Sequence, residues 1–304
     1  MAVAFVFAHR VDADSRHELR DPTWSPDGTV LAYLRDTAGG AQIETVRFDG
    51  THRRLLTPSR IGTYGLSWSP DGRSLAYASA GDIWRVDVGS GSSARLTNAP
   101  ELGAFQPAWS PDGKTIAFTV FEGCFRCTRI YAIDASGGNL RLLADGGRRP
   151  RWSRPTSLLL TSSPVTLHDV TTGENRVVGE GNWASWSQSG DEFTYWGPQG
   201  VYVSTPTRVS PQLVLASRRA VEYPTLSPFG SRLAFVLGER VSIYRRFTRE
   251  RIVLARSDSA HDAPAWSFRG QLAFVADGSC GSGSEIDVVR SDGSRQHALV
   301  RACS

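Results

Sequence analysis

Four cysteines are the residues of this chain whose type and spacing most directly suggest chemistry. Cys124 and Cys127 form a Cys-x-x-Cys motif, while Cys280 and Cys303 lie near the end of the chain. Cysteines in such patterns bind zinc, exchange electrons or form disulfides. Which of these applies depends on how the fold places the two pairs relative to each other.

Arginines and one His-Asp pair are the other candidate binding residues. Arg presents planar, bidentate donors to carboxylates, so clustered arginines indicate a docking surface for an acidic or anionic partner. A solvated rim that serves solubility is the alternative. His261-Asp262 would bind a ligand or ion, or would stabilise its own loop by a hydrogen bond. The arginines in question are Arg126, Arg129, Arg148, Arg149, Arg151, Arg218 and Arg219.

Sequence motifs of known catalytic sites are missing. There is no Gly-x-Ser-x-Gly turn in a strand-to-helix setting, no phosphate-binding glycine loop and no His-Glu-x-x-His. The histidines fall mostly in different repeats, without metal-ligand spacing. We therefore expect no catalytic residue, metal site or cofactor, although a propeller can assemble an active site from residues scattered around its channel.

A repeated pentapeptide must position these residues. Trp-Ser-Pro-Asp-Gly occurs intact at Trp24–Gly28, Trp68–Gly72 and Trp109–Gly113. Degenerate copies begin at positions 152, 186, 226 and 266. Pro presets the first corner of a turn, Asp accepts local hydrogen bonds and Gly adopts the left-handed conformation. A strand-rich repeat of about 40 residues is the signature of a β-propeller.

Each turn is followed by a strand in which a small residue separates two large ones, such as Leu75-Ala76-Tyr77. Two more strands and the strand before the turn complete each repeat. The sequence therefore predicts an all-β, seven-bladed β-propeller of four-stranded antiparallel blades, with six or eight blades as minor alternatives. The repeat Trp should pack between blades, and the repeat Asp residues should form turns.

One propeller domain is predicted over residues 21–304, after an N-terminal strand and connector at 1–20. Val3–Ala8 would add to the edge of the last blade, or would be the tail of a repeat whose beginning is missing. The chain as given shows no signal peptide, since this apolar run is short and lacks a basic start. Four polar residues of the connector resemble a metal cluster, but a solvated segment is favoured: Asp12, Asp14, His17 and Glu18.

The repeat resembles the WD-like propeller repeat of TolB-type proteins: Trp-Ser-Pro-Asp-Gly, Leu-Ala-Tyr or Ile-Ala-Phe, Ile-Tyr-x-Ile-Asp and Arg-Leu-Leu-Thr. The resemblance covers about residues 21–301. Similar repeats form propellers attached to tricorn-like and prolyl-oligopeptidase-like peptidases. TolB is periplasmic and docks an outer-membrane lipoprotein on its propeller, so the resemblance implies a periplasmic or secreted protein with an envelope association. The α/β domain that precedes the propeller in TolB has no counterpart in this sequence.

Propeller geometry gives the cysteines and arginines a common face. Cys124-Phe-Arg-Cys127 lies between strands two and three of the third repeat, Cys280 occupies the equivalent loop of the seventh, and Cys303 follows the last strand. We predict disulfides 124–127 and 280–303 and an oxidising compartment. A four-cysteine zinc site is disfavoured because the two blades are well separated, and a redox-active motif is a further alternative. The segment 146–151 is expected to be a loop on this face.

Function is expected to be non-catalytic binding of a protein partner on one face by a monomer. The alternative is a propeller enzyme or carbohydrate-binding lectin, with a channel-mouth site near His261 and Asp262. A propeller detached from a peptidase is a third possibility. Lys114 is the only lysine among 34 basic residues, and no recognition helix accompanies the net charge of +4, so nucleic acid is not expected as a partner. No apolar run is long enough for membrane insertion.

Overall fold

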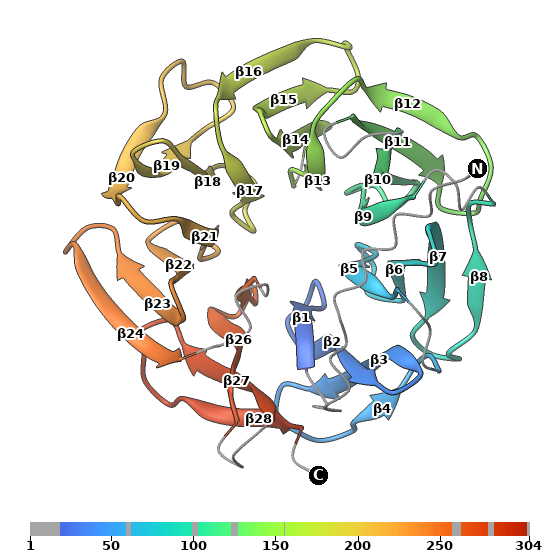
Figure 1. The fold of residues 1–304 in the computed structure, drawn as a ribbon, viewed down its shortest axis with the longest axis horizontal. Helices are drawn as coiled ribbons and strands as arrows, with labels where there is room; N and C mark the ends of the chain where they lie inside the picture. The colour runs from blue at the N-terminus through green and yellow to red at the C-terminus, as the bar shows by residue number, and fades with distance from the viewer. Residues whose placement is uncertain are drawn as a thin grey trace.

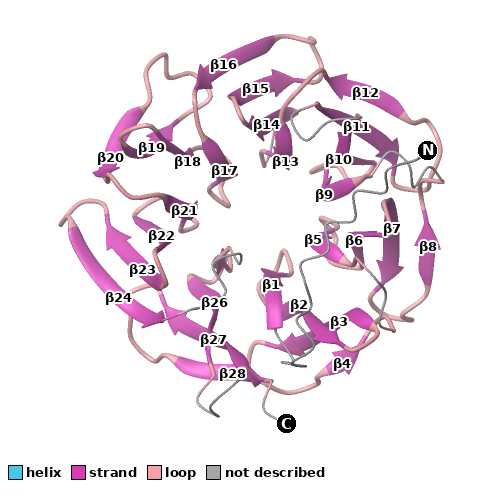
Figure 2. Ribbon diagram, viewed as in Figure 1, coloured by secondary structure: helices cyan, strands magenta, loops and turns pink. Residues whose placement is uncertain are grey.

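A computed structural model describes residues 19–58, 62–98, 103–122, 127–154, 156–256, 263–278 and 283–302. Strands, turns and loops make up these residues, without a helix among them (Figure 2). The strands form seven four-stranded antiparallel sheets that follow one another around a ring (Figure 1). The predicted seven-bladed propeller is confirmed.

Consecutive segments of the chain supply the blades, and each blade begins with its innermost strand (Figure 1). Blades one to three contain β1 (Leu19–Trp24), β2 (Val30–Thr37), β3 (Gly40–Arg47), β4 (Arg54–Leu55), β5 (Tyr64–Trp68), β6 (Ser74–Ser79), β7 (Asp82–Asp87), β8 (Ser93–Arg95), β9 (Phe105–Trp109), β10 (Thr115–Phe121), β11 (Thr128–Asp134) and β12 (Arg141–Ala144).

Blades four to seven follow the same order with shorter strands in blades four and five. They contain β13 (Arg148–Trp152), β14 (Leu158–Ser162), β15 (Val165–Asp169), β16 (Asn175–Gly179), β17 (Asn182–Trp186), β18 (Phe193–Gly197), β19 (Gly200–Ser204), β20 (Gln212–Ala216), β21 (Val221–Leu226), β22 (Arg232–Leu237), β23 (Arg240–Arg245), β24 (Glu250–Arg256), β25 (Ala265–Trp266), β26 (Gln271–Asp277), β27 (Ser284–Arg290) and β28 (His297–Arg301).

The pentapeptide forms the turn between the first two strands of a blade. In blade two, Ser69 Oγ donates to Asp71 Oδ1 at 2.6 Å and accepts from the backbone N of Ser74 at 2.9 Å. Gly72 closes the turn with a φ of 71°. The hydrogen bond from Ser69 lowers the pKa of Asp71 below its ordinary value. The repeat Asp thus acts as a turn former, as the sequence predicts.

Apolar packing between neighbouring blades forms the core. Leu34 of blade one, for example, shares a buried cluster with Trp68 and Tyr77 of blade two. The ring closes in the same way, because Leu19 packs with Val275 of blade seven and its backbone N donates to Ser284 Oγ at 2.7 Å. Within the described residues, each blade takes all four strands from its own repeat. A single repeat cannot bury its apolar faces alone, so the blades stabilise one another.

The repeat Trp adds a polar link between blades. In five blades its indole Nε1 donates to a backbone oxygen of the preceding blade, at 3.0–3.2 Å. The predicted inter-blade packing of this residue is therefore confirmed in those blades. Blade six has Leu226 at this position, and in blade three the buried Nε1 of Trp109 has no hydrogen-bond partner among the described residues.

Several predicted features lie outside the described residues: the strand and connector within residues 1–18, Arg126, Cys124, Cys280, Cys303 and the pair His261-Asp262. Only Cys127 among the cysteines lies inside them, so both disulfide pairings stay predictions. The expectation of a loop at 146–151 was wrong in part. Arg148–Trp152 is the innermost strand of blade four, because this segment of the degenerate repeat pairs with β14. Among described residues, no helix is long and apolar enough to span a bilayer.

Candidate functional site

A bulge recurs at the start of the innermost strands. In β1, β5, β9, β13, β17 and β21 the pairing register slips just before the repeat Trp or Leu. A bulge bends its strand and redirects one side chain. The residue three positions before the Trp or Leu has φ between 50° and 66° in each case: Asp21, Gly65, Gln106, Arg149, Trp183 and Tyr223.

Backbone strain marks five of these six positions. Gly65 adopts a positive φ without penalty, whereas a bulky side chain at such a φ is an outlier. Such conformations cost on the order of 1–3 kcal/mol each and gather at binding and active sites. The backbone at this position favours Gly, so it does not explain why Trp183 or Tyr223 is present. Their side chains therefore indicate a site.

Three of the bulge residues, from blades four, five and six, contact one another. The Arg149 guanidinium carbon lies 5.9 Å from the Trp183 ring centroid and 5.4 Å from that of Tyr223. The two rings are 5.3 Å apart and tilted by 51°. Trp196 extends this aromatic surface, with its ring centroid 5.9 Å from that of Trp183. We call Arg149, Trp183 and Tyr223 the aromatic–arginine cluster.

Positive charge accumulates beside the cluster. Arg149 makes no ion pair within the part of the chain that the structure describes. Arg151 lies two residues further along β13 and is exposed to solvent. The surrounding protein atoms, and after them the charge of Arg149, lower the pKa of Arg151 below its ordinary value. The carboxylate of Asp21 acts in the opposite direction on that pKa. The positive charges of Arg149 and Arg151 therefore lie close enough to affect each other, and the negative charge of Asp21 partly offsets them.

Asp21 and its neighbour Arg20 form hydrogen bonds with residues of blades one and two. Asp21 Oδ2 accepts from the backbone N of Gly65 at 3.1 Å. The Arg20 guanidinium binds the Asp36 carboxylate at 2.9–3.0 Å and also donates to the Thr63 backbone oxygen at 2.9 Å. The charges of Arg20 and Asp21 are therefore compensated by contacts within blades one and two.

Comparison with known proteins agrees with the repeat. The TolB beta propeller domain family matches residues 8–201, which is more than half of the chain. This chain belongs to that family. The "uncharacterized peptidase YuxL" of Bacillus subtilis is 38% identical over 74 residues, which cover 24% of this chain and 10% of that protein.

Solved structures show the same fold at low identity. A Mycobacterium tuberculosis puromycin-hydrolyzing peptidase has a TM-score of 0.75 at 18% identity, covering 95% of this chain and 53% of that one. TolB from Acinetobacter baumannii has a TM-score of 0.59 at 18% identity, covering 89% of this chain and 63% of that one. This TolB-type propeller thus spans less than two thirds of these relatives.

The predicted arginines are only partly brought together. Arg148, Arg149 and Arg151 share β13, and Arg148 lies 5.8 Å from the ring centroid of Phe121. Arg129 is instead neutralised, because it pairs with Glu122 and, at 2.7 Å, with Asp145. These carboxylates raise the pKa of Arg129. Two exposed residues lie between β20 and β21, outside the contacts described above: Arg218 and Arg219.

Sequence reasoning missed the aromatic members of the cluster. Trp183 and Tyr223 lie outside the repeated pentapeptide, so the motif analysis does not select them. A usable signal exists, because four bulge residues directly precede Pro, three positions before the repeat Trp or Leu: Asp21, Gln106, Arg149 and Tyr223. Trp183 occupies the same position without the Pro.

Other polar groups of the site region have structural roles. His168 of blade four is buried and bonds Thr161 at 2.9 Å and Asn175 at 2.7 Å. Burial lowers the pKa of His168, so the ring is held neutral inside its blade. Within the described residues, no group of three His, Cys, Asp or Glu side chains could hold a metal ion. The rings and the guanidinium of the aromatic–arginine cluster suit binding by stacking and hydrogen bonding.

Proposed function

We propose that this TolB-type propeller is a binding module that docks a protein partner at the aromatic–arginine cluster. The observation that supports this most directly is Arg149, which adopts a strained backbone conformation between two aromatic rings and has no ion pair among the described residues. Interface hot spots are enriched in Trp, Tyr and Arg. The cluster has all three types at contact distance.

The partner segment we propose carries a carboxylate and an apolar or aromatic side chain. Arg149 has five N–H donors, and ring contacts with Trp183 and Tyr223 leave them to bind a carboxylate. Two neighbouring cations, Arg149 and Arg151, favour a negative charge. The aromatic surface continued by Trp196 would pack against the apolar side chain.

Location and cysteine pairing belong to the same proposal. Membership of the TolB beta propeller domain family supports a periplasmic or secreted protein. In such an oxidising compartment we expect the disulfides 124–127 and 280–303. Four free thiols in unfolded, unreduced protein would contradict the pairing. The peptidase relatives support a second proposal, in which the propeller binds peptide substrates for a peptidase domain.

The experiment is a selection of peptides from a random display library on the purified propeller. We expect enrichment of peptides with Asp or Glu beside an aromatic or aliphatic residue. Trp183→Gly and Arg149→Gln should weaken a selected peptide at least tenfold in fluorescence anisotropy. Glycine suits the positive φ at position 183, so the first variant is expected to fold.

Gln106→Gly is the matched control, because it changes the same bulge position in blade three, outside the cluster. Its peptide affinity should equal that of the wild type. Equal affinity in all three variants, or selected peptides without acidic residues, would overturn the proposal. A selected sequence with a required free C-terminal carboxylate would favour the peptidase-related proposal.

A further inference from the structure

Trp109 is the exception among the repeat tryptophans. The equivalent indoles at 24, 68, 152, 186 and 266 each donate to the preceding blade, but the buried Nε1 of Trp109 has no partner in the part of the chain that the structure describes. Its backbone N instead donates to Ser67 Oγ at 3.1 Å. Buried donors in native proteins are nearly always satisfied, so an exception needs an explanation.

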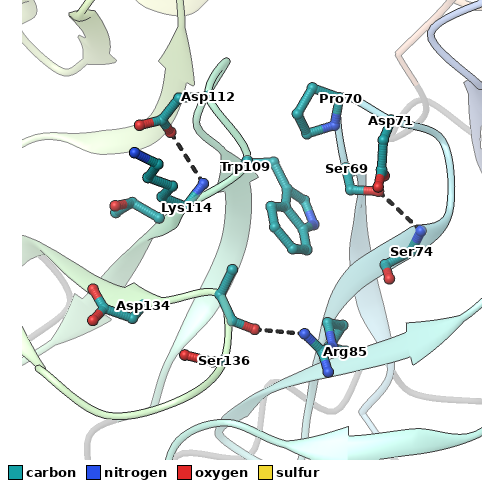
Figure 3. Close-up of a pocket in the computed structure, with 13 residues that line it drawn as sticks. Ser69, Pro70, Asp71, Ser74, Arg85, Trp109, Asp112, Lys114, Asp134 and Ser136 are labelled. Atoms are coloured by element: carbon teal, nitrogen blue, oxygen red, sulfur yellow. Dashed lines mark hydrogen bonds between the residues drawn. The ribbon is translucent and has the colours of Figure 1, made fainter.

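An open cleft of about 770 Å³ lies where Trp109 departs from the pattern. It separates blades two and three at the pentapeptide end of the strands, away from the aromatic–arginine cluster. Figure 3 shows the Trp109 indole between the blade-two turn at Ser69–Asp71 and Lys114 of blade three. Arg85 links the two blades by donating to the Ala135 backbone oxygen at 2.8 Å.

Unused polar groups line this cleft. In the turns of blades two and three, Oδ1 of Asp71 and Asp112 accepts the local hydrogen bonds, and Oδ2 accepts none within the described residues. In the turn of blade one, by contrast, Asp27 Oδ2 accepts from Thr29 Oγ1 at 2.7 Å. Lys114 replaces that Thr in blade three, and its ammonium makes no ion pair with a described residue.

Charges in the cleft nearly cancel. Two cations, Arg85 and Lys114, face three carboxylates, which belong to Asp71, Asp112 and Asp134. Asp134 is also paired with Arg141 at 3.2 Å. A strongly charged ligand would meet repulsion from one set or the other, whereas a neutral ligand with many hydroxyls could use both donors and acceptors.

We propose that the cleft between blades two and three binds a neutral oligosaccharide. Trp109 lines the cleft, and its indole offers an apolar face for the C–H side of a sugar ring. Lys114 and the free oxygens of Asp71 and Asp112 bind further hydroxyls. The cleft falls within the range of about 300–1,000 Å³ that small-molecule sites occupy. The site does not depend on the proposed partner docking.

The test is saturation-transfer NMR with three neutral probes and one charged probe. The neutral probes are cellotetraose, maltotetraose and triacetylchitotriose, and the charged probe is trigalacturonate. We expect saturable, millimolar binding of at least one neutral probe and weaker binding of trigalacturonate. Trp109→Ala should weaken the bound probe at least fivefold, because it removes the stacking surface, and Trp109→Phe should weaken it less, because it keeps an aromatic face.

Trp152→Phe is the matched control, because it removes an indole that already donates, at 3.1 Å, to Ala108 of the preceding blade. It should lose stability and keep sugar affinity. Trp109→Phe should keep stability and most of the sugar affinity, because it loses no hydrogen bond to a described residue and retains an aromatic face. The proposal is overturned if no neutral probe binds saturably up to tens of millimolar, or if binding is unchanged in Trp109→Ala. It is also overturned if trigalacturonate binds more tightly than every neutral probe.

Discussion

The two ends of the innermost strands differ in which features recur from blade to blade. At the pentapeptide end, blades one to three repeat both residues and contacts, with the Ser Oγ to Asp Oδ1 hydrogen bond at 2.6 Å in all three. At the bulge end, six blades repeat the backbone conformation, but the side chains differ completely. Repeated contacts therefore build the fold, while varied side chains on a repeated backbone form the candidate site.

Blade four shows most clearly how the pentapeptide end and the bulge end differ. It has lost the Asp of its turn, and Ser153 Oγ donates instead to the Gly190 backbone oxygen at 3.1 Å. Its bulge end carries Arg149 and leads to Arg151. Loss of the regular turn is tolerated because neighbouring blades supply the packing, whereas the bulge end gains the charge of the cluster.

Truncating a repeat Trp at the pentapeptide end should have the largest effect on the free energy of unfolding. Trp68 is 7% exposed, packs in a buried cluster and donates to the Thr23 backbone oxygen at 3.1 Å. Trp68→Ala should lower the free energy of unfolding by about 3–5 kcal/mol in urea denaturation. Trp183→Gly should cost less than half as much, because relief of backbone strain offsets lost contacts. Equal losses would contradict the distinction between the ends.

Exchanging residues at the bulge position should test the strain directly. A Cβ on Gly65 would lie 3.3 Å from Gln106 Cα, and the φ of 66° disfavours any L side chain. Gly65→Ala should lower the free energy of unfolding by about 1–2 kcal/mol. Gln106→Gly should raise it or leave it unchanged, as measured by the same denaturation curves. A marked loss in Gln106→Gly would show that the bulge side chain stabilises the fold.

Acid should weaken the pentapeptide end through its turn carboxylates. The hydrogen bond from Ser69 holds the pKa of Asp71 below its ordinary value in the folded protein. The unfolded chain then binds more protons below about pH 4, so this contribution is present above pH 4 and lost as pH falls through the lower folded pKa.

Asp71→Asn should therefore lower the free energy of unfolding at pH 7 by about 0.5 kcal/mol, since Asp71 is exposed and its interactions are screened by solvent, and should flatten the decline in acid. Denaturation at several pH values from neutral to acid measures both effects. Glu174→Gln is the control, since Glu174 is exposed and makes no ion pair among the described residues. An Asp71 variant with an unchanged acid slope would show that the turn does not bind the charged form preferentially.

Much of the fold could be predicted from local sequence, because its signals are local. The Pro-Asp-Gly turn and the large-small-large strand are set by neighbouring residues, and their period gave seven blades. The assignment of 146–151 to a loop failed because Arg148-Arg149-Pro150-Arg151 has no strand pattern of its own. Pairing with Leu160 and Ser162 makes Arg148–Trp152 a strand.

Composition and spacing by themselves determined the repeat, the turn chemistry, the inter-blade role of most repeat tryptophans and a cluster of arginines near residue 149. Tertiary structure alone decided that Arg149 meets Trp183 and Tyr223, since these residues come from three blades and are redirected by bulges. It alone decided that Trp109 lacks the hydrogen bond of its equivalents. Both facts depend on how neighbouring blades pack against each other, and the sequence of a single repeat does not determine that packing.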